Sequence, residues 1–254
     1  MSSQIGSAPQ GEPAALGHAT KLRGCRFIAE ETTAFEFEKP RNNFQFTAGQ
    51  FVDVSMSGAK TNGAEQLTHT FSLASSPFDE DIVQATRMRD TAFKRTLSAL
   101  SIGSEVRITT ARGSFILHKN VSRPAVFLAG GIGIAPFVSM LRNAAVNKLQ
   151  IPISLFYANR SLKDAAFMEN LRQLERSMRN FIFVPTLTRI DSAYRWNGET
   201  GHISPEMLSK YVIHLQTSIC YIAGPPPMVS STRRVLIAAG VDVDDIRTEE
   251  FAGY

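Results

Sequence analysis

Cysteine is scarce in this sequence, which has Cys25 and Cys220 among 254 residues. The two have neither the CxxC nor the Cys/His spacing of zinc sites, and two thiolates cannot supply the four ligands of an iron–sulfur cluster. The sequence therefore predicts no metal site, and we assign Cys220 to core packing.

A long apolar run is also missing. No window reaches the roughly 20 apolar residues that a membrane-spanning helix needs. The first residues lack the basic start and apolar core of a secretory signal. These absences predict a protein with no membrane span that resides in the cytoplasm.

Neither sign of charge dominates. The sequence has 27 Lys and Arg against 23 Asp and Glu, a net charge of +4, and its basic residues are interspersed rather than gathered in a run. A nucleic-acid-binding barrel needs a basic patch or stripe, so that function is disfavoured. A mildly basic face would also suit an acidic redox protein.

The composition and the hydrophobic pattern of the sequence predict a tail followed by two domains. Residues 1–20 are rich in Ser, Gly, Pro and Ala, a composition that favours a flexible tail. Over residues 21–122, short stretches alternate apolar and polar positions, as at Phe35 and Phe37, between turn residues. This pattern predicts a small antiparallel β-barrel or sandwich with one helix over 91–100.

Residues 123–254 follow a different rhythm. Four apolar runs, AVFLA, ISLFYA, FIFVP and ICYIA, are each followed by a turn and mostly by a one-sided helical pattern. Continuous apolar strands that alternate with amphipathic helices predict a parallel sheet covered by helices on both faces. The fold class expected is therefore an N-terminal antiparallel β-barrel followed by a C-terminal α/β domain.

The first candidate site is AGGIGIAPF at 129–137, between an apolar strand and an amphipathic helix. Gly131 and Gly133 permit positive φ and close approach of a ligand to the backbone, and Pro136 suits a first helical turn, whose amides can bind an anion. The spacing is GxGxxP rather than the dinucleotide fingerprint GxGxxG. A tight turn that binds nothing would need the same glycines.

Three further turns follow apolar strands: YANR at 157–160, TLTR at 186–189 and AGPPPM at 223–228. The carboxyl ends of parallel strands meet at one edge of a sheet, where ligands bind, so we expect Arg160 and Arg189 to line one crevice. Ordinary surface positions are an equal alternative for both arginines.

The second candidate site lies in the strand-rich half, in THTFSLASSP at 68–77 and RMRDTAFKR at 87–95. Phe71 could lie against a flat ring while Ser72 hydrogen-bonds the edge of that ring. Asp90 or Thr91 could cap a helix whose amides hold a phosphate. An ordinary strand and helix start would have the same residues.

Seven segments, taken in order, resemble the ferredoxin–NADP reductase superfamily: HTFSLASSP, RMRDTAFKRTL, GSF at 113–115, AGGIGIAPF, YANR, IAGPPPMV and the terminal EEFAGY. The resemblance implies an FAD-binding barrel at 21–122 and an NAD(P)-binding α/β domain at 123–254. It implies an FAD-dependent oxidoreductase that exchanges hydride with NADPH or NADH and then passes electrons to a separate acceptor. That acceptor would be a small redox protein, such as ferredoxin or flavodoxin, or an oxygenase component.

The resemblance also implies which residues bind the cofactors. For the flavin they are His69, Thr70, Phe71, Ser72, Arg87, Met88, Arg89, Thr91, Ala92, Phe251 and Tyr254. For the pyridine nucleotide they are Gly131, Gly133, Pro136, Asn159, Arg160, Arg189, Gly224, Pro225 and Met228. The implied catalytic residues are Ser72, which would hydrogen-bond flavin N5, Glu250, which would relay a proton, and Tyr254, which would shield the ring.

Two positions depart from the family pattern. The flavin motif usually reads Arg-x-Tyr-Ser/Thr, whereas His69 and Phe71 stand at its first and third positions. An always-charged arginine is thereby lost, and we predict that Arg87 or Arg89 supplies the missing charge to the FAD pyrophosphate.

The nucleotide preference depends on the end of the second strand of the α/β domain. Asn159 and Arg160 offer no acid for the ribose hydroxyls, which favours NADPH, although Asp164 is close enough to act as that acid. Two other functions remain open for the whole chain: a reductase of free flavin or ferric chelates, and a non-catalytic electron-transfer or binding module.

Overall fold

The computed structural model describes residues 17–41, 43–57, 66–190 and 195–251 of the chain. The tail predicted at 1–20 lies outside the described residues as far as residue 16. Residues 18–20 belong to the first strand, where they pair with the strand at 105–108. Among the helices of these ranges, none combines the length and the apolar character that crossing a bilayer requires.

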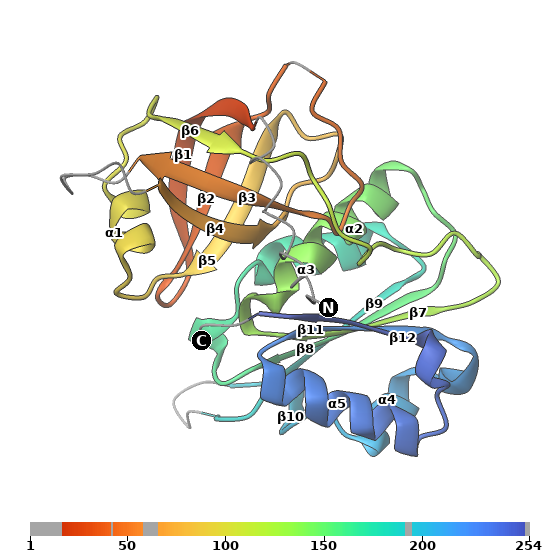
Figure 1. Ribbon diagram of the computed structural model, residues 1–254. Coiled ribbons are helices and arrows are strands. Elements are labelled where there is room, and N and C mark those ends of the chain that lie inside the picture. Colours follow the sequence, from red (N-terminus) through yellow and green to blue (C-terminus); the bar gives the residue numbers. More distant parts are fainter. Residues whose placement is uncertain (1–16, 42, 58–65, 191–194, 252–254) are drawn as a thin grey trace, which may run out of the picture.

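The N-terminal half is a six-stranded antiparallel sheet (Figure 1). Its strands are β1 (His18–Ala29), β2 (Thr32–Glu38), β3 (Phe51–Ser57), β4 (Gln66–Ser72), β5 (Asp81–Arg87) and β6 (Glu105–Ile108), in the order β4-β3-β6-β1-β2-β5. A bridge between Leu73, directly after β4, and Gln84, in the middle of β5, joins the two outer strands, so the sheet curls into a barrel. The predicted barrel is confirmed.

Alternation along each strand fills the barrel. On β3, Val52 and Val54 are fully buried, whereas Asp53 between them faces outward and binds Arg112. Helix α1 (Ala92–Ser98) covers one end of the barrel with Phe93 and Leu97, and the Thr91 side chain caps it by accepting a hydrogen bond from the Lys94 amide. The helix predicted over 91–100 is thus present.

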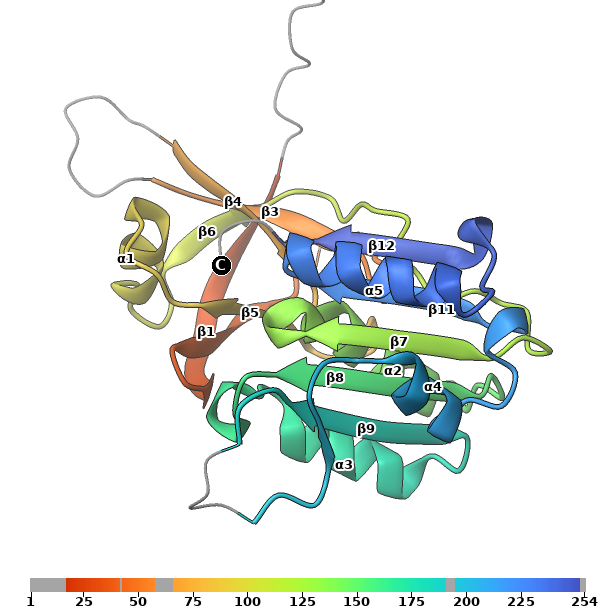
Figure 2. The same ribbon diagram turned by 90° about the horizontal axis from the view of Figure 1, so that it is seen from below.

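The C-terminal half is a six-stranded parallel sheet with helices on both faces (Figure 2). Its strands are β7 (Ala125–Gly130), β8 (Ile153–Asn159), β9 (Phe181–Leu187), β10 (Glu199–Thr200), β11 (Ile219–Gly224) and β12 (Ile246–Glu250), in the order β10-β9-β8-β7-β11-β12. Helices α2 (Ala135–Val146) and α3 (Met168–Ser177) cover one face, and α4 (Pro205–Tyr211) and α5 (Pro226–Ala238) cover the other.

Short 3₁₀ turns lie between the elements of this half, two of them after β7 and β8 and two before β11 and β12. They are η1 (Gly131–Ile134), η2 (Leu162–Asp164), η3 (Leu215–Thr217) and η4 (Val243–Asp245). Cys220 is fully buried on β11, and burial raises the pKa of its thiol to about 12, as expected for a packing residue.

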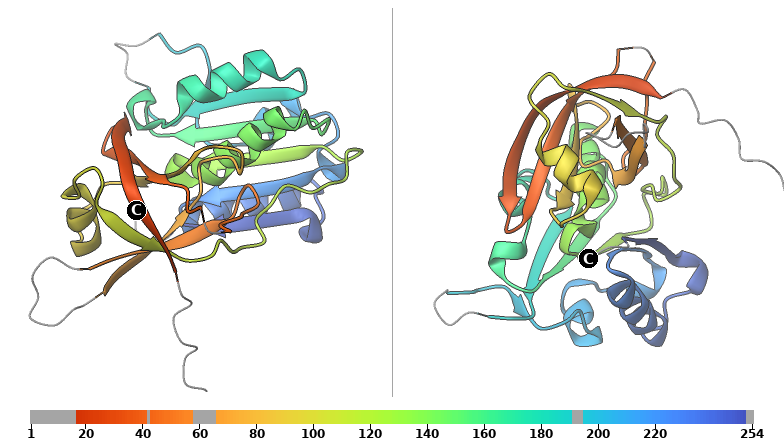
Figure 3. Two further views of the ribbon diagram at one scale, coloured as in Figure 1. Left: turned by 90° about the horizontal axis from the view of Figure 1, so that it is seen from above. Right: turned by 60° about the vertical axis from the view of Figure 1, so that its left-hand side comes forward.

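The barrel lies against the face of the sheet that carries α2 (Figure 3), and one apolar cluster contains residues of both halves. Polar contacts fix this arrangement. The Ser139 hydroxyl on α2 donates to the Ser75 carbonyl at 2.6 Å, and Arg142 on the same helix binds Asp79 at 2.9 Å. The carboxyl ends of the parallel strands are thereby held beside β4 and β5 of the barrel.

Candidate functional site

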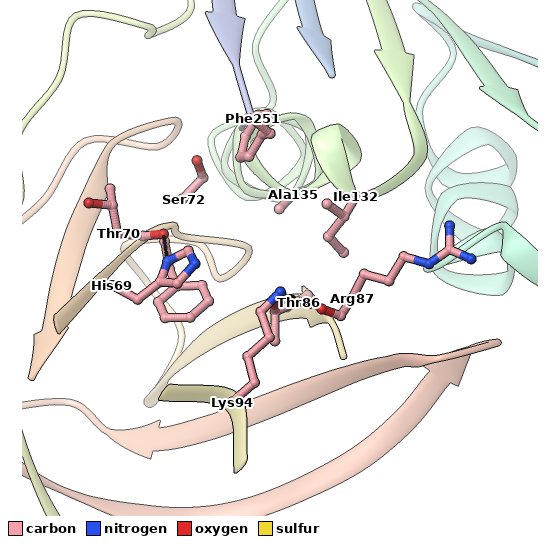
Figure 4. Close-up of a pocket in the computed structure, with 11 residues that line it drawn as sticks. His69, Thr70, Ser72, Thr86, Arg87, Lys94, Ile132, Ala135 and Phe251 are labelled. Carbon is pink, nitrogen blue, oxygen red and sulfur yellow. Dashed lines mark hydrogen bonds between the residues drawn. The ribbon is translucent and has the colours of Figure 1, made fainter. Parts of the chain in front are cut away.

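A pocket opens where the barrel meets the α/β half, and we call it the barrel pocket (Figure 4). It is lined by His69, Thr70, Phe71, Ser72, Ala85, Thr86, Arg87, Lys94, Ile132, Ala135 and Phe251. The first eight residues belong to the barrel and α1, whereas Ile132, Ala135 and Phe251 come from η1, α2 and the segment after β12. The pocket therefore exists because the two halves pack together.

Aromatic rings form one wall of the barrel pocket. The rings of His69 and Phe71 stack with centroids 4.7 Å apart, and Phe93 of α1 lies 5.2 Å from His69 and 5.7 Å from Phe71. Phe71 is buried, with 6% of its surface exposed. A flat heterocycle could pack against such a wall.

A carboxyl group stands beside Ser72 in this pocket. The Ser72 hydroxyl donates to Glu249 Oε2 at 3.5 Å, where Ser72 is buried and Glu249 is partly buried. Burial raises the pKa of Glu249 to about 7, which outweighs the lowering by the Ser72 hydrogen bond. This carboxyl can therefore gain or lose a proton near neutral pH.

The sequence pointed to Glu250 for this role, but the structure places Glu249 next to Ser72 and leaves Glu250 exposed. Successive side chains of a strand point to opposite faces. Phe251 lines the barrel pocket, so Glu249, two positions before it, shares its side of the chain. That alternation was the signal that would have selected Glu249 from the sequence.

Three cationic side chains near the barrel pocket differ in their contacts and in their exposure. Arg87 donates two hydrogen bonds to Glu31, at 3.2 and 3.1 Å, and lies 3.6 Å from Asp164 of η2. Arg89 is exposed and faces a neighbouring cleft. Lys94 is buried, with 7% of its surface exposed, and its ammonium donates to the Arg87 carbonyl at 2.6 Å.

The neighbouring cleft runs along the carboxyl ends of the parallel strands and has a volume of about 270 Å³. We call it the sheet-edge cleft. It is lined by Thr32, Arg87, Arg89, Gly130, Gly131, Ile132, Ala158, Asn159, Arg160, Asp164, Thr188, His202, Pro225 and Met228. The turns after four parallel strands thus meet in one crevice, as their positions in the sequence predict.

The glycines of η1 have two separate roles. Gly131 has φ +52° and nothing within 4 Å of the place where a Cβ would stand, so its backbone is open to a ligand in the cleft. A Cβ on Gly133 would stand 2.4 Å from the Ala223 carbonyl oxygen, which means that Gly133 allows η1 to pack on β11. Pro136 is buried in the first turn of α2.

An orphaned polar atom supports a ligand in the sheet-edge cleft. Asn159 is 6% exposed, and within the described part of the chain its Oδ1 has no hydrogen-bond partner. A buried acceptor without a partner is costly, and a hydroxyl or amide of a bound molecule would satisfy it. The residues of this cleft therefore fit a nucleotide with ribose hydroxyls.

Arg189 lies beyond this cleft, in a third space of about 320 Å³ that we call the lateral cavity. It is lined by Glu30, Ser161, Leu162, Lys163, Leu187, Arg189, Ile190, Arg195 and Trp196. Arg160 and Arg189 thus face separate spaces, although the Arg189 amide donates to the Arg160 carbonyl at 2.7 Å.

The remaining predicted site residues lie around these spaces. Gly224 is buried and its carbonyl accepts from the Phe251 amide at 3.0 Å, which holds Phe251 at the barrel pocket. Met88 packs against the barrel core, and Thr91 and Ala92 are exposed at the start of α1. Tyr254 lies outside the described residues.

The barrel pocket and the sheet-edge cleft adjoin at Arg87 and Ile132, which line both. A flat ring system against Phe71 and a second one in the cleft would therefore be neighbours. The barrel pocket has an aromatic wall, a buried cation and the Ser72 hydroxyl, which together fit a flavin nucleotide. The sheet-edge cleft fits a second nucleotide.

Comparison with known proteins supports this assignment. Residues 127–234 match the family model described as the oxidoreductase NAD-binding domain. The chain is 27% identical over 240 residues to the toluate 1,2-dioxygenase electron transfer component of Pseudomonas putida, covering 93% of this chain and 68% of that protein. It is 28% identical to the propane 2-monooxygenase reductase component of Mycolicibacterium smegmatis, covering 82% of this chain and 60% of that protein.

Solved structures share the fold. A ferredoxin NADP+ reductase from Neisseria gonorrhoeae with bound FAD and NADP superposes with a TM-score of 0.79 at 21% identity, over 93% of this chain and 99% of that one. The FAD/NAD-binding domain of a Vibrio cholerae nitric oxide dioxygenase gives 0.81 at 17% identity, over 92% and 98%. The chain thus contains a segment that matches the oxidoreductase NAD-binding domain, and its two-domain fold is the one found in these FAD- and NAD(P)-binding proteins.

Proposed function

We propose that this protein takes hydride from NADPH or NADH onto FAD and passes the electrons to a separate protein. The observation that carries the proposal is that the barrel pocket and the sheet-edge cleft adjoin, because Arg87 and Ile132 line both. Hydride transfer needs two reacting rings near contact distance in a fixed orientation, and two adjoining sites on packed domains provide that.

When bound, the flavin supplies the redox chemistry, because it accepts hydride and releases electrons singly or in pairs. Phe71 from β4 and Phe251 after β12 would hold its ring and exclude water. The Ser72 hydroxyl would donate a hydrogen bond to N5. Glu249, with a pKa of about 7, would hold or return a proton through Ser72.

We infer a preference for NADPH over NADH. Asp164, the acid available for a ribose hydroxyl, accepts hydrogen bonds from the Ser161 amide and hydroxyl at 3.1 and 2.8 Å and lies 3.6 Å from Arg87. The lateral cavity has three cations, Lys163, Arg189 and Arg195, against one acid, Glu30. Such a lining favours a 2′-phosphate.

The nucleotide preference is tested by steady-state kinetics of the wild type and Arg189→Ala. We expect the variant to raise the KM for NADPH by about tenfold and to leave the KM for NADH unchanged, because a charge-assisted hydrogen bond to the phosphate is lost. Equal KM values for both nucleotides in the wild type would contradict the preference.

The proposed acceptor is an oxygenase component or a small redox protein such as ferredoxin or flavodoxin. The relatives named above are electron-transfer or reductase components of oxygenases, and the net charge of +4 is compatible with an acidic partner. Residence in the cytoplasm, where reduced pyridine nucleotide is available, belongs to the same proposal.

The decisive experiment is an absorption spectrum of the purified protein before and after anaerobic addition of NADPH. We expect a flavin spectrum that bleaches on addition and recovers with an artificial electron acceptor. A colourless preparation that neither takes up FAD nor oxidises either reduced nucleotide would refute the proposal.

A reductase of free flavin or ferric chelates is the second candidate, and His69 in place of the motif arginine favours it, because a weaker grip would let flavin leave. Gel filtration distinguishes the two: the proposed enzyme keeps its yellow colour, whereas a free-flavin reductase elutes colourless yet oxidises NADPH when flavin is added. A non-catalytic module would not oxidise the nucleotide at all.

A further inference from the structure

Lys94 is a buried ammonium without a charged partner in the barrel pocket. It is 7% exposed, although lysine is almost never this buried unless it is paired. Its Nζ donates to the Arg87 carbonyl at 2.6 Å, and no carboxylate among the described residues lies within the 4.0 Å of an ion pair. Two of its three N–H donors are available for another acceptor.

The surroundings of Lys94 disfavour its charge. Burial lowers the pKa of the Lys94 ammonium, and the positive charge of Arg89 lowers it further. The negative charge of an anion bound in the pocket would offset both effects. The barrel pocket therefore has a cationic site that a bound anion would stabilise.

The arginines that the sequence proposed for this role are occupied or directed elsewhere. The guanidinium of Arg87 is held by Glu31 and Asp164, and Figure 4 shows it extending away from the other labelled side chains of the pocket. Arg89 is exposed and lines the sheet-edge cleft. Lys94 lines the barrel pocket, and no carboxylate of the described residues holds its ammonium.

We propose that Lys94 binds the phosphate groups of the flavin nucleotide, taking the place of the motif arginine at the position that His69 occupies. The proposal rests on the proposed function, because it requires a flavin in the barrel pocket. Figure 4 shows Lys94 on the opposite side of this pocket from Ser72 and Phe251. A flavin nucleotide whose ring lies at Ser72 would place its phosphate-bearing chain toward Lys94.

Lys94 is held at both its backbone and its ammonium. The Lys94 amide donates to the Thr91 side chain at 3.3 Å in the first turn of α1, and the ammonium reaches the end of β5 through the Arg87 carbonyl. The charge is thereby held in one place before the ligand arrives, which lowers the entropic cost of binding.

The test compares three flavins that differ in phosphate. Apoprotein is titrated with FAD, FMN and riboflavin by fluorescence, for the wild type, Lys94→Met and Lys94→Arg. We expect K94M to weaken FAD and FMN binding by about 10- to 100-fold, the loss of one charge-assisted hydrogen bond, with riboflavin binding unchanged. K94R, which keeps the charge, should bind FAD within about threefold of the wild type.

Lys39→Met is the matched control. Lys39 also donates its ammonium to a barrel carbonyl, that of Pro77, but it lies outside the barrel pocket. We expect K39M to bind all three flavins as the wild type does. The salt dependence of flavin affinity in the wild type gives a further test. Affinity for FAD should fall with added salt, whereas affinity for riboflavin, which has no phosphate, should not.

Two results would overturn the proposal while leaving the proposed function intact: K94M that binds FAD as tightly as the wild type, or K94M that loses riboflavin to the same extent as FAD. The second would mean that Lys94 supports the pocket through its bond to Arg87. If the wild type binds none of the three flavins, the proposed function fails as well. A salt-independent FAD affinity would also overturn the role of Lys94, whether or not the variants fold.

Discussion

Ser72 and Glu249 are 177 positions apart in the sequence, yet their side-chain oxygens lie 3.5 Å apart in the barrel pocket. This contact joins the last residue of β4 to β12, the strand that precedes Phe251. A hydroxyl that can donate to a ring nitrogen and a carboxyl that titrates near neutral pH form a short path for one proton. Two predictions follow from their chemistry.

Replacing Ser72 with alanine should slow flavin reduction by NADPH. The hydrogen bond to N5 and the path to Glu249 are both lost, so we expect a decrease of about 10- to 100-fold, in the range typical of a positioned proton-transfer group. Anaerobic stopped-flow absorbance measures the rate. Ser55→Ala is the control. Ser55 is on β3, its hydroxyl is bonded to that of Thr68 on β4, and the variant should react like the wild type. A wild-type rate in S72A would exclude the role of Ser72.

Glu249 should make stability depend on pH. Its folded-state pKa of about 7 lies above the value of an unfolded glutamate, so the folded protein favours the protonated form. That contribution to stability is fully present below about pH 4.3, the unfolded pKa, and is lost as pH rises through 7. Glu249→Gln removes the titration, so its stability relative to the wild type should increase by about 1–3 kcal/mol between pH 5 and pH 8.

Urea unfolding at the two pH values measures this difference. Glu250→Gln is the control, because Glu250 is exposed on the other side of the same strand end. Its stability relative to the wild type should not change with pH. If E249Q and the wild type follow parallel pH curves, the carboxyl of Glu249 is not buried in solution as it is in the structure.

At the scale of elements, β7, η1 and α2 form one continuous unit. One of its glycines gives a ligand access to the backbone, and another allows close packing. Gly131 exposes its backbone to the sheet-edge cleft, whereas Gly133 lets the turn approach β11. Spacing in the sequence cannot distinguish the two roles, because both glycines precede the same helix. The backbone of Ala223, 90 residues further along, is what makes the difference.

Alanine substitutions should separate these roles. In Gly133→Ala the new Cβ would meet the Ala223 carbonyl at 2.4 Å, so we expect a loss of roughly 1–3 kcal/mol in the free energy of unfolding. Gly131→Ala meets no atom but keeps a positive φ, and should lose about 1 kcal/mol. Thermal unfolding measures the loss of stability in both variants. The KM for NADPH measures ligand access to the cleft at Gly131. G133A as stable as G131A would show that the turn does not pack tightly on β11.

At the scale of the whole molecule, α2 connects the two halves. It packs on the parallel sheet with one side, while Ser139 and Arg142 bind the loop of the barrel at 75–79. The relative position of the two candidate cofactor sites depends on these contacts. A helix that belongs to one domain therefore determines the distance between sites on both.

A double-mutant cycle on Asp79→Asn and Arg142→Met measures this connection. The pair is partly buried, so we expect a coupling energy of about 0.5–1 kcal/mol in urea unfolding. Glu169→Gln with Arg176→Met, an exposed pair within α3, is the matched control and should couple by less than about 0.5 kcal/mol. A coupling of zero across the interface would mean that apolar packing alone joins the halves.

Much of this arrangement follows from local patterns in the sequence. The apolar runs at 125–129 and 153–158 became neighbouring parallel strands, and the turns after them met in one cleft. Local patterns could not supply the partners of Arg87, because Glu31 and Asp164 are 56 and 77 positions away. The burial of Lys94 was hidden for the same reason: it depends on the carboxyl end of β5 and on η1 beside it.

Arg87 belongs to both candidate sites, since its side chain reaches Asp164 at the nucleotide side and its carbonyl holds Lys94 at the flavin side. Thermodynamic linkage then imposes a symmetry on the two ligands: whatever factor the flavin applies to the dissociation constant of the nucleotide, the nucleotide must apply to that of the flavin. Wherever that factor differs from one, the flavin content of a preparation depends on the pyridine nucleotide present in its buffers.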